Sequence, residues 1–71
     1  MRYAIVIEPG ENSYGAYVPD LPGCVAAAPS REEVVKFIHV AIGEHIQILR
    51  EDGIPVPEPH STTEHGEVES A

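Results

Sequence analysis

The sequence predicts an α+β fold, a two-layer β-β-β-α sandwich in which a three-stranded antiparallel sheet carries one helix on one face. Three short apolar runs at 3–7, 14–18 and 24–28 are separated by turn-forming residues, which is typical of strands. The longer stretch 31–51 has apolar residues at helical spacing. Because one helix covers only one face of a sheet, the other face is expected to need a partner.

The run Tyr3–Ile7 is apolar at every position, so both of its faces are apolar. A strand with one face in water normally alternates with polar residues, and we therefore predict that this strand is central in its sheet. The run Tyr14–Val18 follows a turn-rich loop at 9–13, which predicts a β-hairpin. The third run, Cys24–Ala28, has small side chains that favour close packing. The pattern leaves open which face of the sheet meets the helix.

The connection between the second and third runs contains two prolines and an acid. Leu21-Pro22-Gly23-Cys24 fits a type II turn, because proline presets φ at the second position and glycine accepts a positive φ at the third. Asp20 precedes the turn and can accept hydrogen bonds from nearby backbone amides. A stiff turn with an acid and an apolar Leu21 is predicted to be a recognition edge; the alternative is that it only joins two strands.

The helix has recognisable start and stop signals. Ser30 is a favourable N-cap, and Glu33 three residues later completes a capping-box pattern. The helix is expected to end near Glu51, with Gly53 in the left-handed cap position. The apolar residues cover about half of the helix circumference. They are Val34, Phe37, Ile38, Ala41, Ile42, Ile46, Ile48 and Leu49.

After the helix, Ile54–Pro59 contains three prolines and is expected to be extended. A fourth strand here is possible but limited by the missing amide donors. Residues 60–71 are polar and acidic, which predicts a mostly disordered tail with a possible short strand at 67–69. We therefore divide the chain into one folded domain, 1–59, and a tail, 60–71.

Composition limits the function. The formal charge of −8 argues against direct nucleic-acid binding and favours a basic protein partner. A domain of 71 residues has a small core, and Cys24, the single cysteine, excludes an internal disulfide. A homo-oligomer, dimer or tetramer, is therefore expected as extra support. With no signal peptide and no membrane-spanning run, the expected compartment is the cytoplasm.

Catalysis has little support in the sequence. Glu8 and Asp20 are the only acids near sheet ends, whereas a ribonuclease-H-type nuclease needs several clustered acids to hold Mg²⁺. Cys24 lies inside a predicted strand with no evident base. His39 and His45 are six residues apart, unlike helical metal ligands four apart, and His45 is read either as a core histidine or as a switch or subunit contact. We predict no enzyme, metal or cofactor.

Taken together, several motifs resemble the HicB antitoxin family over roughly residues 3–59. They are Gly15-Ala16-Tyr17, Pro-Asp-Leu-Pro-Gly-Cys at 19–24, the Ser-x-Glu-Glu helix start at 30–33 and Asp-Gly-Ile-Pro-x-Pro at 52–57. The resemblance implies a partly degraded ribonuclease-H-like fold. It also implies a partner, HicA, a small basic toxin of double-stranded-RNA-binding fold that cleaves mRNA and whose active site the antitoxin covers. Where the family carries a C-terminal DNA-binding domain, this chain has no room for one after residue 59, so operator binding is not expected.

Two functional hypotheses follow. The first is an antitoxin that occludes a HicA-type toxin, and the second is a stand-alone homo-oligomeric module of the same fold without a toxin partner. The predicted toxin contacts are Glu8, Tyr17, Asp20, Leu21 and Pro22.

Overall fold

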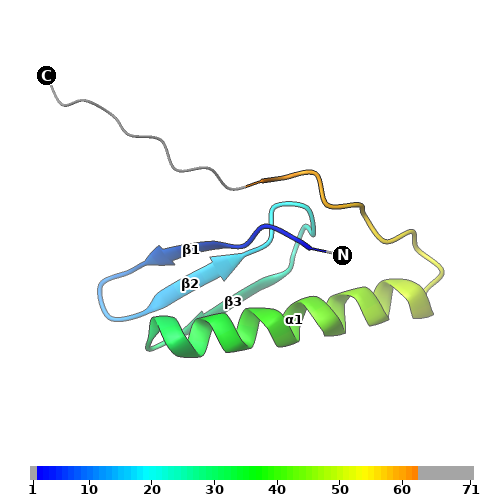
Figure 1. Ribbon diagram of the computed structural model, residues 1–71. Helices are drawn as coiled ribbons and strands as arrows, with labels where there is room; N and C mark the ends of the chain where they lie inside the picture. Colours follow the sequence, from blue (N-terminus) through cyan, green and yellow to red (C-terminus); the bar gives the residue numbers. More distant parts are fainter. Residues whose placement is uncertain (1, 63–71) are drawn as a thin grey trace, which may run out of the picture.

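The computed structural model describes residues 2–62 and consists of three strands followed by one helix (Figure 1). The strands are β1 (Val6–Pro9), β2 (Tyr14–Tyr17) and β3 (Val25–Ala28), and the helix is α1 (Arg31–Glu51). The strands form one antiparallel sheet, and α1 runs across one of its faces. The predicted three-stranded α+β arrangement is confirmed.

The strand order is β1-β2-β3, so β2 is central and β1 is an edge strand. The prediction that the first strand is central was wrong. Each hairpin connection places consecutive strands side by side, and β2 therefore has a neighbour on both edges. β1 also starts later than expected, at Val6, and extends to Pro9, which pairs with Tyr14. A proline is tolerated there because an edge strand has one unpaired side.

The pairing register decides which face meets the helix. Ile7 lies opposite Ala16, and Ala16 lies opposite Ala26, so these three side chains share a face. Ala16 is 4% exposed and belongs to the core, which identifies this face as the one under α1. The buried core consists of Ala16, Val18, Leu21, Cys24, Ala28, Val34 and Ile38.

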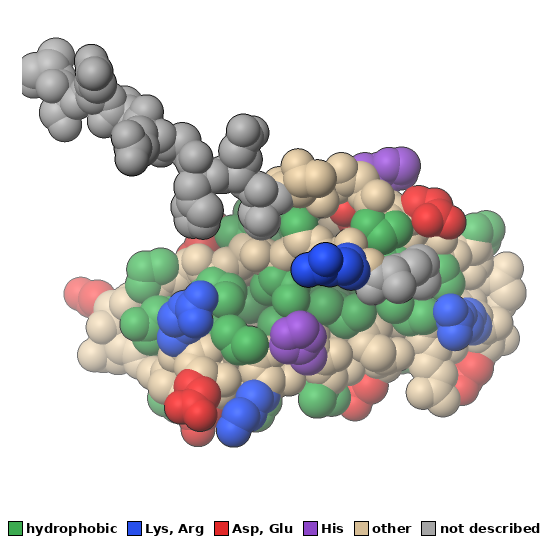
Figure 2. Space-filling model, in the orientation of Figure 1, with side chains coloured by type: hydrophobic (Ala, Val, Ile, Leu, Met, Phe, Trp, Pro, Cys, Tyr) green, Lys and Arg blue, Asp and Glu red, His purple; other side chains and the backbone are tan. Residues whose placement is uncertain are grey.

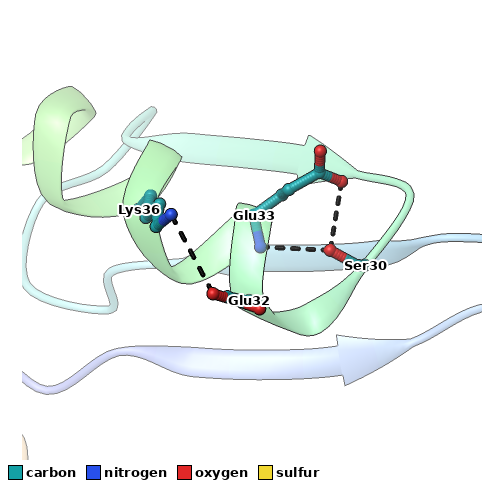
Figure 3. Close-up of polar contacts among 4 residues, drawn as sticks. All are labelled: Ser30, Glu32, Glu33 and Lys36. Carbon is teal, nitrogen blue, oxygen red and sulfur yellow. Dashed lines mark hydrogen bonds and ion pairs between the residues drawn. The ribbon is translucent and has the colours of Figure 1, made fainter.

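The start of α1 carries the predicted cap. The Ser30 hydroxyl accepts a hydrogen bond from the Glu33 amide at 3.2 Å and donates one to the Glu33 carboxylate at 3.0 Å (Figure 3). Glu33 thus closes the box through the cap hydroxyl rather than through the cap backbone amide. One turn further, Lys36 lies 4.0 Å from Glu32 on an exposed surface, where an ion pair adds little stability.

The end of α1 is also as predicted. Gly53 has φ of +69°, and its amide donates to the Arg50 carbonyl at 3.2 Å. The Ile54 amide donates to the Leu49 carbonyl at 2.8 Å. These two bonds make a Schellman motif, which requires the left-handed conformation that glycine adopts at no steric cost.

Two residues of the apolar arc of α1 lie largely outside the core. Phe37 and Ile48 are 50% and 57% exposed. The sheet is narrow, and it covers a smaller arc of the helix than the apolar residues occupy. Val40 on the same side of α1 is 60% exposed, so the helix carries an apolar surface outside the core.

Beyond α1 the chain is extended and turns back toward the N-terminal segment and the loop that joins β2 to β3 (Figure 1). Residues 54–62 form no strand, so the possible fourth strand is not found in the described part of the chain. The strand considered at 67–69 lies outside the described residues. His60 and Ser61 contact the folded part, so these contacts continue past the boundary expected at residue 59.

Candidate protein-binding surface

The sheet face opposite α1 is not covered by any helix of the described residues. Tyr17 and Val25 point to this open face, and they are 41% and 64% exposed. The register arranges its side chains in two rows across the sheet, Val6, Tyr17 and Val25 in one and Glu8, Gly15 and Ala27 in the other. The open face is thus mainly apolar, with an aromatic ring near its middle and a carboxylate at one edge.

The loop between β2 and β3 is closed by three backbone hydrogen bonds. The Val18 amide donates to the Cys24 carbonyl at 3.2 Å. The Leu21 amide donates to the Val18 carbonyl at 3.1 Å, and the Cys24 amide donates to the Leu21 carbonyl at 3.0 Å. Gly23 has φ of +86°, which together with the last bond matches the predicted type II turn. The loop is therefore held by its own backbone.

Leu21 does not form an exposed recognition edge. Its side chain is 0% exposed and lies in the core with Val34 and Ile38 of α1. The interpretation of Leu21 as a surface contact is wrong for this structure, because the turn directs the side chain inward and leaves Pro22 outside. Leu21 holds the loop in place instead.

The Asp20 carboxylate accepts hydrogen bonds from the extended segment 54–62 that follows α1, the C-terminal segment. One carboxylate oxygen accepts hydrogen bonds from the His60 amide at 2.9 Å and the Ser61 amide at 2.8 Å. The other accepts from the Ser61 hydroxyl at 3.0 Å. The Ser61 amide, with smaller contributions from the His60 amide and the Ser61 hydroxyl, lowers the pKa of Asp20 below its ordinary value. A carboxylate held in this way is ionised and not free to meet a partner.

A second contact attaches the same C-terminal segment to the N-terminal one. The Tyr3 hydroxyl donates to the Pro57 carbonyl. A shallow groove between Arg2–Ala4 and Ser61–Thr62 shows that the two segments run beside each other. The sequence carried two weak signals for this attachment: an acid able to accept hydrogen bonds from backbone amides, and a proline-rich extended segment. No pattern in the sequence linked Asp20 to His60 and Ser61, which are 40 and 41 positions away.

Two grooves flank α1. The one beside β3 has a volume of about 510 Å³ and is lined mostly by apolar groups, from Val25, Ala26, Ala27, Phe37, Val40, Ala41 and Glu44. The one beside the N-terminal segment has about 320 Å³ and is lined by Arg2, Tyr3, Ile5, His39 and Ile42. Figure 2 shows hydrophobic side chains gathered in a band between helix and sheet, with Lys, Arg and His side chains beside it.

The residues that the sequence offered for catalysis are dispersed in the described part of the chain. Glu8 lies opposite Gly15 at the start of β2, whereas Asp20 follows the end of that strand, so the two acids are not brought together. Burial raises the pKa of the Cys24 thiol, which makes the thiolate scarce. Residues 2–62 contain no group of three or more metal-ligating side chains. Within the same residues, no helix is both long enough and apolar enough to cross a membrane.

Comparison with known proteins decides the family. The family model described as the HicB_like antitoxin of bacterial toxin-antitoxin systems matches residues 3–69. The chain belongs to the HicB-like antitoxin family. Members of this family are typically non-enzymatic.

The chain is also similar to curated archaeal, bacterial and phage proteins. A UPF0150 protein of Archaeoglobus fulgidus is 39% identical over 56 residues, covering 75% of this chain and 81% of that protein. A UPF0150 protein of Helicobacter pylori is 45% identical over 47 residues, 66% and 65% of the two chains. An uncharacterised 14.9 kDa protein of Haemophilus phage HP1 is 37% identical over 57 residues, 80% of this chain but 43% of the phage protein. The HicB-like chain thus spans less than half of the phage protein. No solved structure gives a significant match.

Proposed function

We propose that this HicB-like chain is an antitoxin that binds a small basic mRNA-cleaving toxin of the HicA type and covers its active site. The observation that carries the proposal is the family match over residues 3–69. The open sheet face and the charge of the chain agree with it.

The open face has the features of a protein-binding surface. It is an apolar sheet surface with an exposed tyrosine near its middle, and tyrosine is enriched among residues that dominate binding energy. Glu8 stands at its edge, and the exposed Pro22 lies in the loop beyond β2. We propose Tyr17, Glu8 and Pro22 as toxin contacts. Asp20 can contact the toxin only when its hydrogen bonds to His60 and Ser61 are broken. Leu21 is buried, and it supports the binding surface by holding the loop between β2 and β3 in place.

Charge supports a basic partner. Residues 2–62 carry nine Asp and Glu side chains against four Arg and Lys side chains. An acidic surface attracts a basic protein at a distance, which raises the association rate and disfavours RNA or DNA as competitors. Occlusion needs no catalytic residue on the antitoxin, because a bound surface that excludes the mRNA suffices.

The test is co-purification of the full chain with a small basic HicA-type toxin encoded beside it, followed by an mRNA-cleavage assay. We expect a stable complex and loss of cleavage when the chain is in excess. Unchanged cleavage at saturating antitoxin, or the absence of any basic partner, would overturn the proposal and favour the stand-alone oligomeric module.

The binding surface has its own test. Tyr17→Ala is expected to weaken the complex roughly thirtyfold, since a central tyrosine often contributes about 2 kcal/mol. Glu8→Lys is expected to weaken it through charge reversal. Glu11→Lys, the same change in the loop between β1 and β2, is the matched control and should have a much smaller effect. Equal effects at positions 8 and 11 would mean that the open face is not the contact.

A further inference from the structure

The hydrogen bonds on Asp20 have the pattern that an arginine side chain makes with a carboxylate. The His60 and Ser61 amides donate to one oxygen at 2.9 and 2.8 Å, and the Ser61 hydroxyl donates to the other at 3.0 Å. A guanidinium group binds a carboxylate in a similar way, with one N–H donated to each oxygen. The C-terminal segment thus provides, from its backbone and one hydroxyl, what an arginine provides from a single planar group.

The donors on Asp20 carry no net charge. Two are peptide amides and one is a hydroxyl, and within residues 2–62 no Lys or Arg side chain forms an ion pair with this carboxylate. An arginine supplies equivalent donors together with a permanent positive charge. A lysine ammonium is a point charge without the planar fork that matches both oxygens. The site therefore favours arginine over lysine.

The position of Asp20 is set by the loop and not by the C-terminal segment. The Leu21 amide, next to Asp20, donates to the Val18 carbonyl at 3.1 Å, and the Cys24 amide donates to the Leu21 carbonyl at 3.0 Å. The Leu21 side chain is fully buried, so the backbone beside Asp20 is anchored in the core. None of these contacts involves the C-terminal segment. A ligand that replaces the segment therefore meets a carboxylate that is already in place.

The attachment at Asp20 can open without unfolding the domain. Residues 54–62 form no strand, and His60 is exposed while Ser61 is only partly buried. Segments with few buried apolar contacts open at a small part of the free energy of global unfolding. The Tyr3 hydroxyl donates to the Pro57 carbonyl, so the segment keeps a second attachment when Asp20 is released. The donors of His60 and Ser61 then stay near Asp20 and can bind it again.

We propose that Asp20 is a binding site for an arginine side chain of a partner protein, and that His60 and Ser61 mask this site by imitating the guanidinium group. Binding of the arginine displaces these two residues. Masking lowers the apparent affinity for the arginine in proportion to the fraction of chains in which Asp20 is free. This inference rests on the proposed function, because a basic HicA-type toxin is the partner that supplies the arginine.

The test without toxin uses the full chain in two forms, unchanged and as Ser61→Pro. Proline removes both donors of Ser61 and fits an extended segment that already contains three prolines. The probe is a blocked Gly-Arg-Gly peptide, whose binding is followed by NMR through the Leu21 amide beside Asp20. The same peptide with lysine in place of arginine is the control. Circular dichroism checks that both forms of the chain are folded.

Masking predicts different dissociation constants for the two forms. If Asp20 is masked in about nine chains of ten, the arginine peptide binds Ser61→Pro about tenfold more tightly than the unchanged chain. We expect a difference of at least this size, a smaller one for Ser61→Ala, which keeps the amide, and weaker binding of the lysine peptide. Asp20→Ala should abolish binding, and Asp52→Ala should leave it intact. Equal dissociation constants for Ser61→Pro and the unchanged chain would overturn the proposal. Equal binding of the two peptides, or no binding to Ser61→Pro, would also overturn it.

The complex with the toxin separates this inference from the proposed function. When the toxin binds, the Ser61 amide is expected to lose its protection from hydrogen exchange, and Ser61→Pro is expected to bind the toxin more tightly than the unchanged chain. A stable complex in which the Ser61 amide stays protected would overturn the displacement and leave the proposed function intact. Failure of the toxin to bind either form would refute the proposed function, and the peptide experiment then decides on the arginine site.

Discussion

The carboxylate of Asp20 is hydrogen-bonded at both of its oxygens to Ser61, through the backbone amide at 2.8 Å and the hydroxyl at 3.0 Å. The two residues are 41 positions apart, and their contact attaches the C-terminal segment to the loop between β2 and β3. The attachment occupies the acid that the sequence offered as a toxin contact. Binding of a basic group to Asp20 would therefore compete with Ser61.

Replacing Asp20 by Ala is expected to release the C-terminal segment. Alanine removes both carboxylate oxygens, which accept the hydrogen bonds of the His60 amide, the Ser61 amide and the Ser61 hydroxyl. Hydrogen exchange of these two amides, measured by NMR, should rise toward the rate of an unstructured peptide, while exchange in β2 stays slow. Asp52→Ala, the same change at the end of α1, is the control and should leave both amides protected. Protection that persists in Asp20→Ala would contradict the attachment.

Acidification is expected to release the same segment. The attached state lowers the pKa of Asp20 below its ordinary value of 3.8, so the ionised carboxylate favours attachment and protonation favours detachment. Attachment should be complete above pH 3.8 and weaken as the pH falls from there through the lower pKa. Chemical shifts of the Ser61 amide against pH measure this. A titration midpoint above pH 3.8 would mean that attachment raises the pKa of Asp20 instead of lowering it.

Leu21→Ala is expected to destabilise the fold by about 2–5 kcal/mol, because it leaves a cavity beneath the loop where Leu21 is fully buried. Urea unfolding measures the loss, and Leu21→Val gives a smaller one if the alanine variant does not fold. Ile54→Ala at a half-exposed position is the control and should cost less than about 1 kcal/mol. Similar losses at both positions would argue against Leu21 as a core residue.

Gly23→Ala and Gly43→Ala are expected to have opposite signs. A Cβ at either glycine meets no atom within 4 Å, so packing is unchanged and the backbone decides. Gly23 has φ of +86°, and alanine there should cost about 1–2 kcal/mol. Gly43 lies inside α1, where alanine should stabilise by up to about 1 kcal/mol. Thermal unfolding of the two variants measures the difference, and equal melting temperatures would contradict the turn geometry.

The sequence by itself determined what depends on neighbouring residues. The Ser30–Glu33 cap, the Gly23 turn and the Gly53 helix end were predicted because each is a contact within a few positions of the chain. The three strands, the helix and the family resemblance followed from these signals and from hydrophobic spacing.

Only the tertiary structure decided which strand is central, which sheet face meets α1, that Leu21 points inward and that Asp20 binds Ser61. The apolar Tyr3–Ile7 run gave no sign of its place at an edge, and the turn pattern fits an inward or an outward Leu21 equally well. These features depend on contacts between residues distant in the chain. Such contacts are set by how the helix and the C-terminal segment fold back over the sheet, and no local spacing encodes that.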